Sequence, residues 1–251
     1  MAETEYGIIE PKIEFPVRKL LVIPHDGGDL TVSYPALGPD FFKANINEMK
    51  KPYSHPRTGE RISFRQPTTS ESISASAYKF GELAKPQIFD PRWLQIGYIV
   101  RTSEGVFANP PKDANGNPRI DEKTLKSLLD KSEKVNGIYL RDRNYFRNRD
   151  FGFAPYETFN QGVQDSEDFS ESGLARLLEH SREKTAKNLG KISSPEFYKN
   201  GVNVFGFEAV EQPLLRTAGL GSGRLFGCDR LCVDGDDWDD NRAGYAFGVL
   251  E

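Results

Sequence analysis

The feature that most constrains this fold is the end of the chain, residues 216–251, RTAGLGSGRLFGCDRLCVDGDDWDDNRAGYAFGVLE. It begins with Gly219, Gly221 and Gly223, and glycine at alternate positions allows the backbone to turn sharply and to approach a partner closely. Lysine is absent after Lys199. These properties predict a set of loops closed by a terminal strand. The rest of the chain must then form the framework that holds those loops.

Between Arg224 and Arg242 the segment is dominated by aspartate and arginine, with Phe226 and Trp238 between them. A mixture of Asp, Arg, Gly, Ser and aromatic side chains resembles an antibody paratope, where rigid aromatic anchors lie among short, adaptable polar groups. The segment therefore predicts a ligand-binding site.

Composition and charge restrict the class of protein. A chain of 251 residues with 37% hydrophobic and 28% charged residues is typical of a globular protein with one large domain or two small ones. A net charge of −4 gives no basic field for nucleic acid or anionic membrane, so neither is an expected partner. The chain has no signal-peptide pattern and no apolar run of about 18 residues. We expect a soluble protein without membrane insertion, either cytoplasmic or carried on a larger, virus-like particle.

Residues 1–85 form an N-terminal region rich in strand and turn signals. The runs 19–24 and 30–37 flank a turn containing Asp26-Gly27, which predicts a β-hairpin. Asp40 is placed to cap a short helix that ends near Met49 and turns Phe42 and Ile46 inward.

A second helix should follow the capping-box spacing of Thr68 and Glu71 and end before Pro86. Its inward face would carry Ile73, Ala77, Phe80 and Ala84. The turn chemistry at Lys85-Pro86 places a domain boundary there.

Residues 86–251 then alternate between strand and helix patterns. Strands are predicted at 92–102, 138–142, 203–208, 213–218 and 244–251. One helix should begin at Asp121, carry Leu125, Leu128 and Leu129, and stop at Asn136-Gly137. Another should begin near Ser170, with Phe169 and Leu174 in hydrophobic-staple spacing, and run to about Asn188. Residues 143–164 have no clear period. This order predicts an α+β fold with a β-rich N-terminal region.

The order of these elements is similar to the C-type lectin fold, in which two helices flank a small mixed or antiparallel sheet and long loops carry the ligand site. Three short stretches, 201–207, 216–219 and 244–249, resemble the "GNVWEW", "RGGS" and "GFRV" steps of the formylglycine-generating-enzyme branch of that fold. Val202 interrupts the first of these and Ala218 replaces a glycine of the second. Within that branch the chain resembles the variable proteins of diversity-generating retroelements.

That resemblance implies a non-enzymatic ligand-binding domain at 86–251, with a hypervariable segment 220–242. Variable positions in the family are Asn codons mutated at their adenines, which cannot reach Lys, Glu, Gln, Met or Trp. Residues 217–242 contain no Lys, Glu, Gln or Met. The side chains predicted to contact ligand are Leu220, Gly221, Ser222, Arg224, Phe226, Cys228, Asp229, Asp236, Asp237, Asp239, Asp240 and Asn241.

The resemblance also implies the partners. The expected ligand is a protein or a cell-surface molecule, as for a phage-like receptor-binding protein, and no cofactor or metal is required. Residues 1–85 would then serve homo-oligomer formation, particle assembly or attachment.

Two features of the tail have alternative interpretations. Trp238 fits either a binding hot spot or a core residue, and the family's codon rule favours a framework role. Asp234 and Asp236 begin a calcium-loop spacing, but Trp238 occupies the next ligand position and Asp239 stands where glycine is needed. A solvated acidic loop is the preferred interpretation.

The two cysteines support a competing hypothesis. Formylglycine-generating enzymes, which use copper, carry two C-terminal cysteines spaced C-x4-C, whereas Cys228 and Cys232 are spaced C-x3-C. The alternative function is therefore a sulfatase-modifying type of enzyme that uses this pair. We favour Cys232 as a small buried hydrophobe and Cys228 as an exposed variable position. A third hypothesis is a structural particle component whose tail is buried against a partner chain.

Other polar residues show no catalytic spacing. His25, His55 and His180 form neither a metal motif nor a Ser-His-Asp set. The alternating charges at 141–143 and 147–150 are more typical of an ion-pair surface than of a phosphate site. The chain has no phosphate loop or dinucleotide fingerprint.

Overall fold

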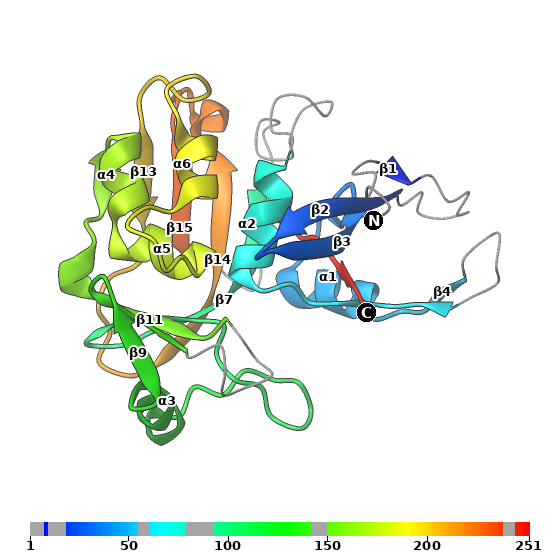
Figure 1. The fold of residues 1–251 in the computed structure, drawn as a ribbon, viewed down its shortest axis with the longest axis horizontal. Coiled ribbons are helices and arrows are strands. Elements are labelled where there is room, and N and C mark those ends of the chain that lie inside the picture. Colours follow the sequence, from blue (N-terminus) through cyan, green and yellow to red (C-terminus); the bar gives the residue numbers. More distant parts are fainter. Residues whose placement is uncertain (1–7, 10–18, 55–60, 79–92, 142–149, 238–243) are drawn as a thin grey trace.

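The computed structural model describes residues 8–9, 19–54, 61–78, 93–141, 150–237 and 244–251 (Figure 1). It is a mixed α+β structure, as the order of sequence patterns predicted. The first region contains β1 (Ile8–Ile9), β2 (Lys19–His25), β3 (Gly28–Tyr34), α1 (Phe42–Met49), β4 (Tyr53–Ser54), β5 (Arg61–Ile62), β6 (Phe64–Arg65) and α2 (Thr69–Ala77).

The middle of the chain is mainly strand. It contains β7 (Trp93–Arg101), β8 (Gly105–Ala108), α3 (Glu122–Leu129), β9 (Ser132–Val135), β10 (Ile138–Arg141), β11 (Gly152–Pro155), the 3₁₀ helix η1 (Tyr156–Thr158) and β12 (Gly162–Gln164). The last part contains α4 (Ser166–Glu171), α5 (Gly173–Glu179), α6 (Lys187–Ser193), β13 (Val202–Phe205), β14 (Leu214–Ser222), η2 (Gly223–Phe226), β15 (Leu231–Asp237), β16 (Gly244–Tyr245) and β17 (Val249–Leu250).

Most strands join one large sheet with the order β12-β13-β15-β14-β7-β8-β11-β10-β9, and β16 pairs with the start of β7. The β13–β15 and β16–β7 pairs are parallel, and the other neighbours in this sheet are antiparallel. Helices α4, α5 and α6 lie against one face of β13, β14 and β15 (Figure 1). Leu220, Leu231 and Val233 turn toward these helices and are fully buried in the main core.

A second sheet has the order β1-β2-β3-β17-β6. Its strand β17 comes from the end of the chain and pairs with both β3 and β6. The predicted division into residues 1–85 and 86–251 therefore assigns residues 249–250 to the wrong region. The predicted boundary at Lys85-Pro86 lies outside the described residues.

Helix α2 lies between the β2–β3 hairpin and the layer that contains α5 and α6 (Figure 1). Its capping box is confirmed, because Thr68 Oγ1 accepts from Glu71 N and the Glu71 carboxylate accepts from Thr68 N. Ile73 and Ala77 are buried as predicted, but every residue of α2 is buried, so the expectation of a single inward face is wrong. The small Ser and Ala side chains allow neighbours to approach on all sides, and Ser72 Oγ donates to Ile96 O. Phe80 and Ala84 lie outside the described residues.

Local signals located several other elements correctly. The β2–β3 hairpin turns at Asp26 and Gly27, which have φ of 47° and 78°. Helix α1 ends at Met49, although Phe41 is at its N-cap and Asp40 accepts a hydrogen bond from the Phe41 backbone instead. Asp121 caps α3 through Thr124 N.

Two helix predictions were wrong in extent. Helix α3 ends at Leu129, and Asn136-Gly137 forms the turn of the β9–β10 hairpin because both residues adopt positive φ. The helix predicted from Ser170 to about Asn188 is divided into α4, α5 and α6. Ser172 caps α5 in an extended conformation, and His180 ends it with φ of 54°.

The described part of the chain contains no helix long and apolar enough to cross a membrane.

Candidate ligand-binding face

The C-terminal segment contains less loop than its composition predicts. β14 and β15 form an antiparallel hairpin, so residues 214–222 and 231–237 are strand, and a short connection, residues 223–230, lies between them. The prediction of an open loop from Gly219 onward is wrong. Glycines alternate with residues such as Leu220 that face the core, and this period of two is the pattern of a strand with one buried face.

Trp93 explains the alternating glycines. Gly221 lies opposite Trp93 in the β14–β7 pairing, and a Cβ on Gly221 would lie 2.2 Å from ring carbons of that indole. A Cβ on Gly219 would lie 2.6 Å from Trp93 Nε1. The two glycines therefore leave room for the indole ring, and sequence reasoning missed the importance of Trp93.

The strand register places a row of residues across the large sheet. Val163, Asn203, Cys232, Gly221 and Trp93 are successive cross-strand partners on β12, β13, β15, β14 and β7. Because side chains alternate along a strand, this row lies on the face opposite the buried Leu220 and Leu231. We call this the outer face of the sheet.

The outer face carries apolar side chains that reach solvent. Val163 is 58% exposed and Phe205, two residues after Asn203 on β13, is 36% exposed. They are the large hydrophobic residues that the described part of the chain leaves exposed. The Phe205 ring lies 6.5 Å from the Trp93 ring. Exposed apolar groups beside an aromatic ring are a typical setting for protein contacts.

The 223–230 connection lies at the end of the hairpin next to this row. Arg224 Nε donates to Asp229 Oδ1 at 2.7 Å, and Arg224 Nη2 donates to the Phe197 carbonyl. The guanidinium also lies 5.3 Å from the centre of the Tyr198 ring. The hydrogen bond from Arg224 holds the pKa of Asp229 below its usual range. Burial raises the pKa of Tyr198 to about 12. In this sequence these contacts join the connection to Phe197 and Tyr198.

The structure separates the predicted contact residues into two groups. Leu220 and Ser222 are fully buried and Gly221 lies beneath Trp93, so the prediction that these three contact ligand is wrong. Asp236 belongs to the framework as well, since its Oδ1 accepts from Arg101 Nη1 at 2.9 Å and Arg216 Nε at 2.7 Å.

The remaining predicted positions lie at or beyond the connection. Arg224 is exposed, while Cys228 and Asp229 are partly exposed. Phe226 belongs to η2 and Asp237 ends β15. Trp238, Asp239, Asp240 and Asn241 lie outside the described residues.

Of the two cysteines, Cys232 has the environment of a packing residue and Cys228 is partly exposed. Both cysteines are free thiols, and Cys232 is 7% exposed, as expected for a buried hydrophobe. Burial raises the pKa of the Cys232 thiol, and the neighbouring Cys228 and Asp234 raise it further. A raised pKa lowers the thiolate fraction that nucleophilic or copper chemistry requires.

Asp234 and Asp236 on β15 likewise make contacts within the chain. Asp234 Oδ1 accepts from Asp236 N at 2.8 Å, and Asp236 is paired with two arginines. Within the described ranges, no group of three His, Cys, Asp or Glu residues could hold a metal ion.

The histidines are in structural settings where they are described. His25 Nδ1 lies 2.9 Å from Ser74 Oγ, and His180 is the left-handed residue that ends α5. His55 and, from the charged runs at 141–143 and 147–150, every residue except Arg141 and Asp150 lie outside the described residues. Arg141, at the start of the first run, is buried.

Comparison with protein-family models, with curated proteins and with solved structures gave no match to this chain.

Proposed function

We propose that this protein is a non-enzymatic ligand-binding protein with a C-type-lectin-like domain, similar to the variable proteins of diversity-generating retroelements. The ligand is a protein or a cell-surface molecule. The observation that carries the proposal is a contrast within one hairpin: the framework holds the strands, whereas Arg224, Cys228 and Asp229 in the connection reach solvent. The proposed variable positions are Arg224, Phe226, Cys228, Asp229, Asp237, Asp239, Asp240 and Asn241.

The fixed part supports this proposal because its contacts do not involve the proposed variable side chains. Trp93 packs over Gly219 and Gly221, and the carboxylate of Asp236 joins β15 to the arginines of β7 and β14. Neither contact is made by a side chain of residues 224–229, so we expect both to persist when those side chains change. A preformed site of this kind reduces the ordering cost of binding.

The outer face supports a macromolecular ligand. The row that contains Val163 and Trp93 crosses the hairpin next to the connection 223–230, since Gly221 and Cys232 flank that connection. The exposed Val163 and Phe205 can supply apolar contact, and Arg224 and Asp229 can supply polar contact at its margin. Apolar anchors surrounded by polar groups are the usual composition of a protein interface.

Two display libraries of the full chain test the proposal. In the connection library Arg224, Phe226, Cys228 and Asp229 are randomised, and in the framework library Leu220, Gly221, Ser222 and Asp236 are randomised. Protease resistance reports the folded fraction, and selection on immobilised lysozyme and streptavidin reports acquired binding. We expect most connection variants to remain folded and some to bind, and most framework variants to be degraded. Equal loss of folding in both libraries, or a folded connection library without binders, would contradict the proposal.

Residues 1–85 have the role of assembly or attachment in this proposal, as the family resemblance implies. Strands β1, β2, β3 and β6 of that region form a five-stranded sheet with β17, so this region is paired with the end of the chain. Light scattering of the full chain would test for a homo-oligomer.

A further inference from the structure

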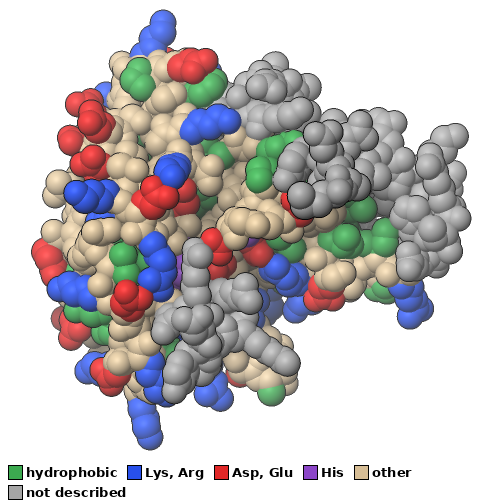
Figure 2. Space-filling model, viewed as in Figure 1, with side chains coloured by type: hydrophobic (Ala, Val, Ile, Leu, Met, Phe, Trp, Pro, Cys, Tyr) green, Lys and Arg blue, Asp and Glu red, His purple; other side chains and the backbone are tan. Residues whose placement is uncertain are grey.

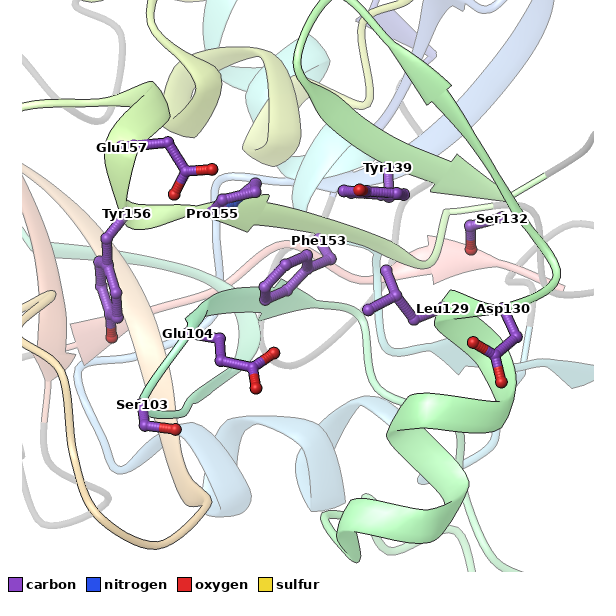
Figure 3. Close-up of a pocket in the computed structure, with 10 residues that line it drawn as sticks. All are labelled: Ser103, Glu104, Leu129, Asp130, Ser132, Tyr139, Phe153, Pro155, Tyr156 and Glu157. Atoms are coloured by element: carbon purple, nitrogen blue, oxygen red, sulfur yellow. The ribbon is translucent and has the colours of Figure 1, made fainter.

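A groove lies at the other end of the large sheet from β12 and β13. It is formed where β10 and β11 meet the C-terminal end of α3 and the turn between β7 and β8 (Figure 3). Its volume is about 740 Å³. Because the sheet order places β12 and β9 at opposite edges, this groove is separate from the outer face described above.

Aromatic side chains form the floor and one end of the groove. Phe153 is 4% exposed, and its ring lies 6.1 Å from that of Tyr139. Tyr156 is held in place because its hydroxyl donates to the carbonyls of Thr102 and Glu208, each at 3.1 Å. In Figure 3, Phe153 lies in the middle of the group and Tyr156 at one end. The partly exposed rings of Tyr139 and Tyr156 therefore supply the aromatic surface of the groove, above the buried Phe153.

The charged residues that line the groove are all acidic, whereas Lys134 lies beside it over the Tyr139 ring. Glu104, Asp130 and Glu157 line the groove and are exposed, and no lining residue is Lys, Arg or His. None of the three carboxylates makes an ion pair with a residue that the structure describes. Lys126 interacts electrostatically with Glu104, but its ion pair is with Glu122. A groove lined by charges of one sign attracts ligands of the opposite sign.

One aromatic ring of the groove already accommodates a cation. Lys134 lies opposite Tyr139 in the β9–β10 pairing, and its Nζ is 5.5 Å from the centre of that ring. This distance is within the range in which an ammonium group is attracted to an aromatic face. The chemistry of the groove therefore suits a cationic group on an apolar stem.

We propose that this groove binds a lysine- or arginine-rich segment of a partner protein. Glu104 precedes β8, Asp130 follows α3 and Glu157 belongs to η1, so the carboxylates are distributed over three elements. A chain that presents several cations engages such a distribution better than a single ammonium ion does. The aromatic surface takes the apolar stems of the basic side chains. This proposal does not depend on the function proposed for the outer face.

Fluorescence anisotropy of the full chain tests the proposal with a fluorescein-labelled peptide of alternating lysine and alanine. The groove variant combines Glu104→Gln, Asp130→Asn and Glu157→Gln. A control variant of equal charge combines Asp29→Asn, Glu167→Gln and Glu196→Gln, all exposed and away from the groove. A peptide with glutamate in place of lysine controls for nonspecific adsorption.

We expect the groove variant to bind the lysine peptide about 10-fold more weakly, because each exposed charge contact contributes roughly a 2- to 5-fold change. Tyr139→Leu should weaken binding about 2- to 5-fold, since it keeps apolar area but removes the cation–π contact. The control variant should change binding by less than about 2-fold.

Equal weakening by the groove and control variants, or no binding by the native chain, would overturn the proposal. Free spermine that binds as tightly as the peptide would overturn the assignment to a protein partner. Thermal denaturation shows whether each variant is folded. If Tyr139→Leu does not fold, the groove variant still tests the proposal, because its three substitutions are at exposed carboxylates.

Discussion

Replacement of Gly221 by alanine is the sharpest test of the framework role of β14. The added Cβ would lie 2.2 Å from Cε3 and Cζ3 of Trp93, whereas carbon atoms in ordinary contact are about 3.5–4.0 Å apart. The indole or the strand must therefore move by roughly 1.3 Å or more. Overpacking of this kind costs about 1–3 kcal/mol in the free energy of unfolding. For a chain of this length, the melting temperature should fall by roughly 2–12 °C.

A double-mutant cycle with Trp93→Ala isolates the cause. When the indole is absent, the methyl group at Gly221 meets no ring, and Gly→Ala should be neutral or stabilise by up to about 1 kcal/mol through the unfolded state. Gly28→Ala is the matched control, since a Cβ there meets a single atom, the His25 carbonyl oxygen, at 3.9 Å. Differential scanning calorimetry or urea denaturation gives the four free energies of the cycle.

A melting temperature of Gly221→Ala within about 1 °C of the native value would refute overpacking against Trp93. Equal destabilisation with and without Trp93 would refute it as well, because the cost would then have a different origin. Either result would return Gly221 to the set of positions free to vary.

Three further outcomes are expected. Asp236→Asn weakens the acceptor of two arginines, one of them the buried Arg101. It should lower the free energy of unfolding, measured in urea, by about 1–3 kcal/mol. An unchanged free energy of unfolding would show that Asp236 is not part of the framework. Burial acts to raise the pKa of Glu71, but its hydrogen bond and ion pair with Arg65 outweigh burial and lower the pKa. The stability that this pair contributes is complete above the unfolded pKa of about 4.3 and is lost as pH falls through the folded pKa. In Glu71→Gln the free energy of unfolding should therefore decrease less steeply as the pH is lowered. Cys232 is buried with a raised pKa, so mass spectrometry after iodoacetamide treatment at pH 8 should show it labelled more slowly than the other cysteine; equal rates would contradict its burial.

Features that depend on neighbouring residues were predictable from the sequence. The turn at Asp26-Gly27, the capping box of Thr68 and Glu71, and the cap at Asp121 are each set by contacts within a few residues. For the same reason the strand that became β7 was recognised from its own apolar composition.

Features set by distant pairing were not predictable in the same way. Gly219 and Gly221 resemble loop residues until Trp93 is placed opposite them. Asp236 resembles an exposed contact residue until Arg101, 135 positions away in the chain, is placed beside it. Residues near Val249 complete a sheet that begins near the other end of the chain, and no local signal specifies that partner. The composition of the tail predicted a surface of mixed chemistry, but the strand register determines which side chains of the tail lie on that surface.

We propose that a fixed hairpin presents positions that are free to change. The most direct test is to sequence the 3′ end of the gene from many clones of its source population, together with any nearby imperfect repeat. We predict differences at Arg224, Phe226, Cys228 and Asp229 and in the segment 237–241, matched by adenines in the repeat. Residues 220–222 and Asp236 should stay constant. An invariant tail, or differences spread equally over the buried and exposed positions, would contradict the account.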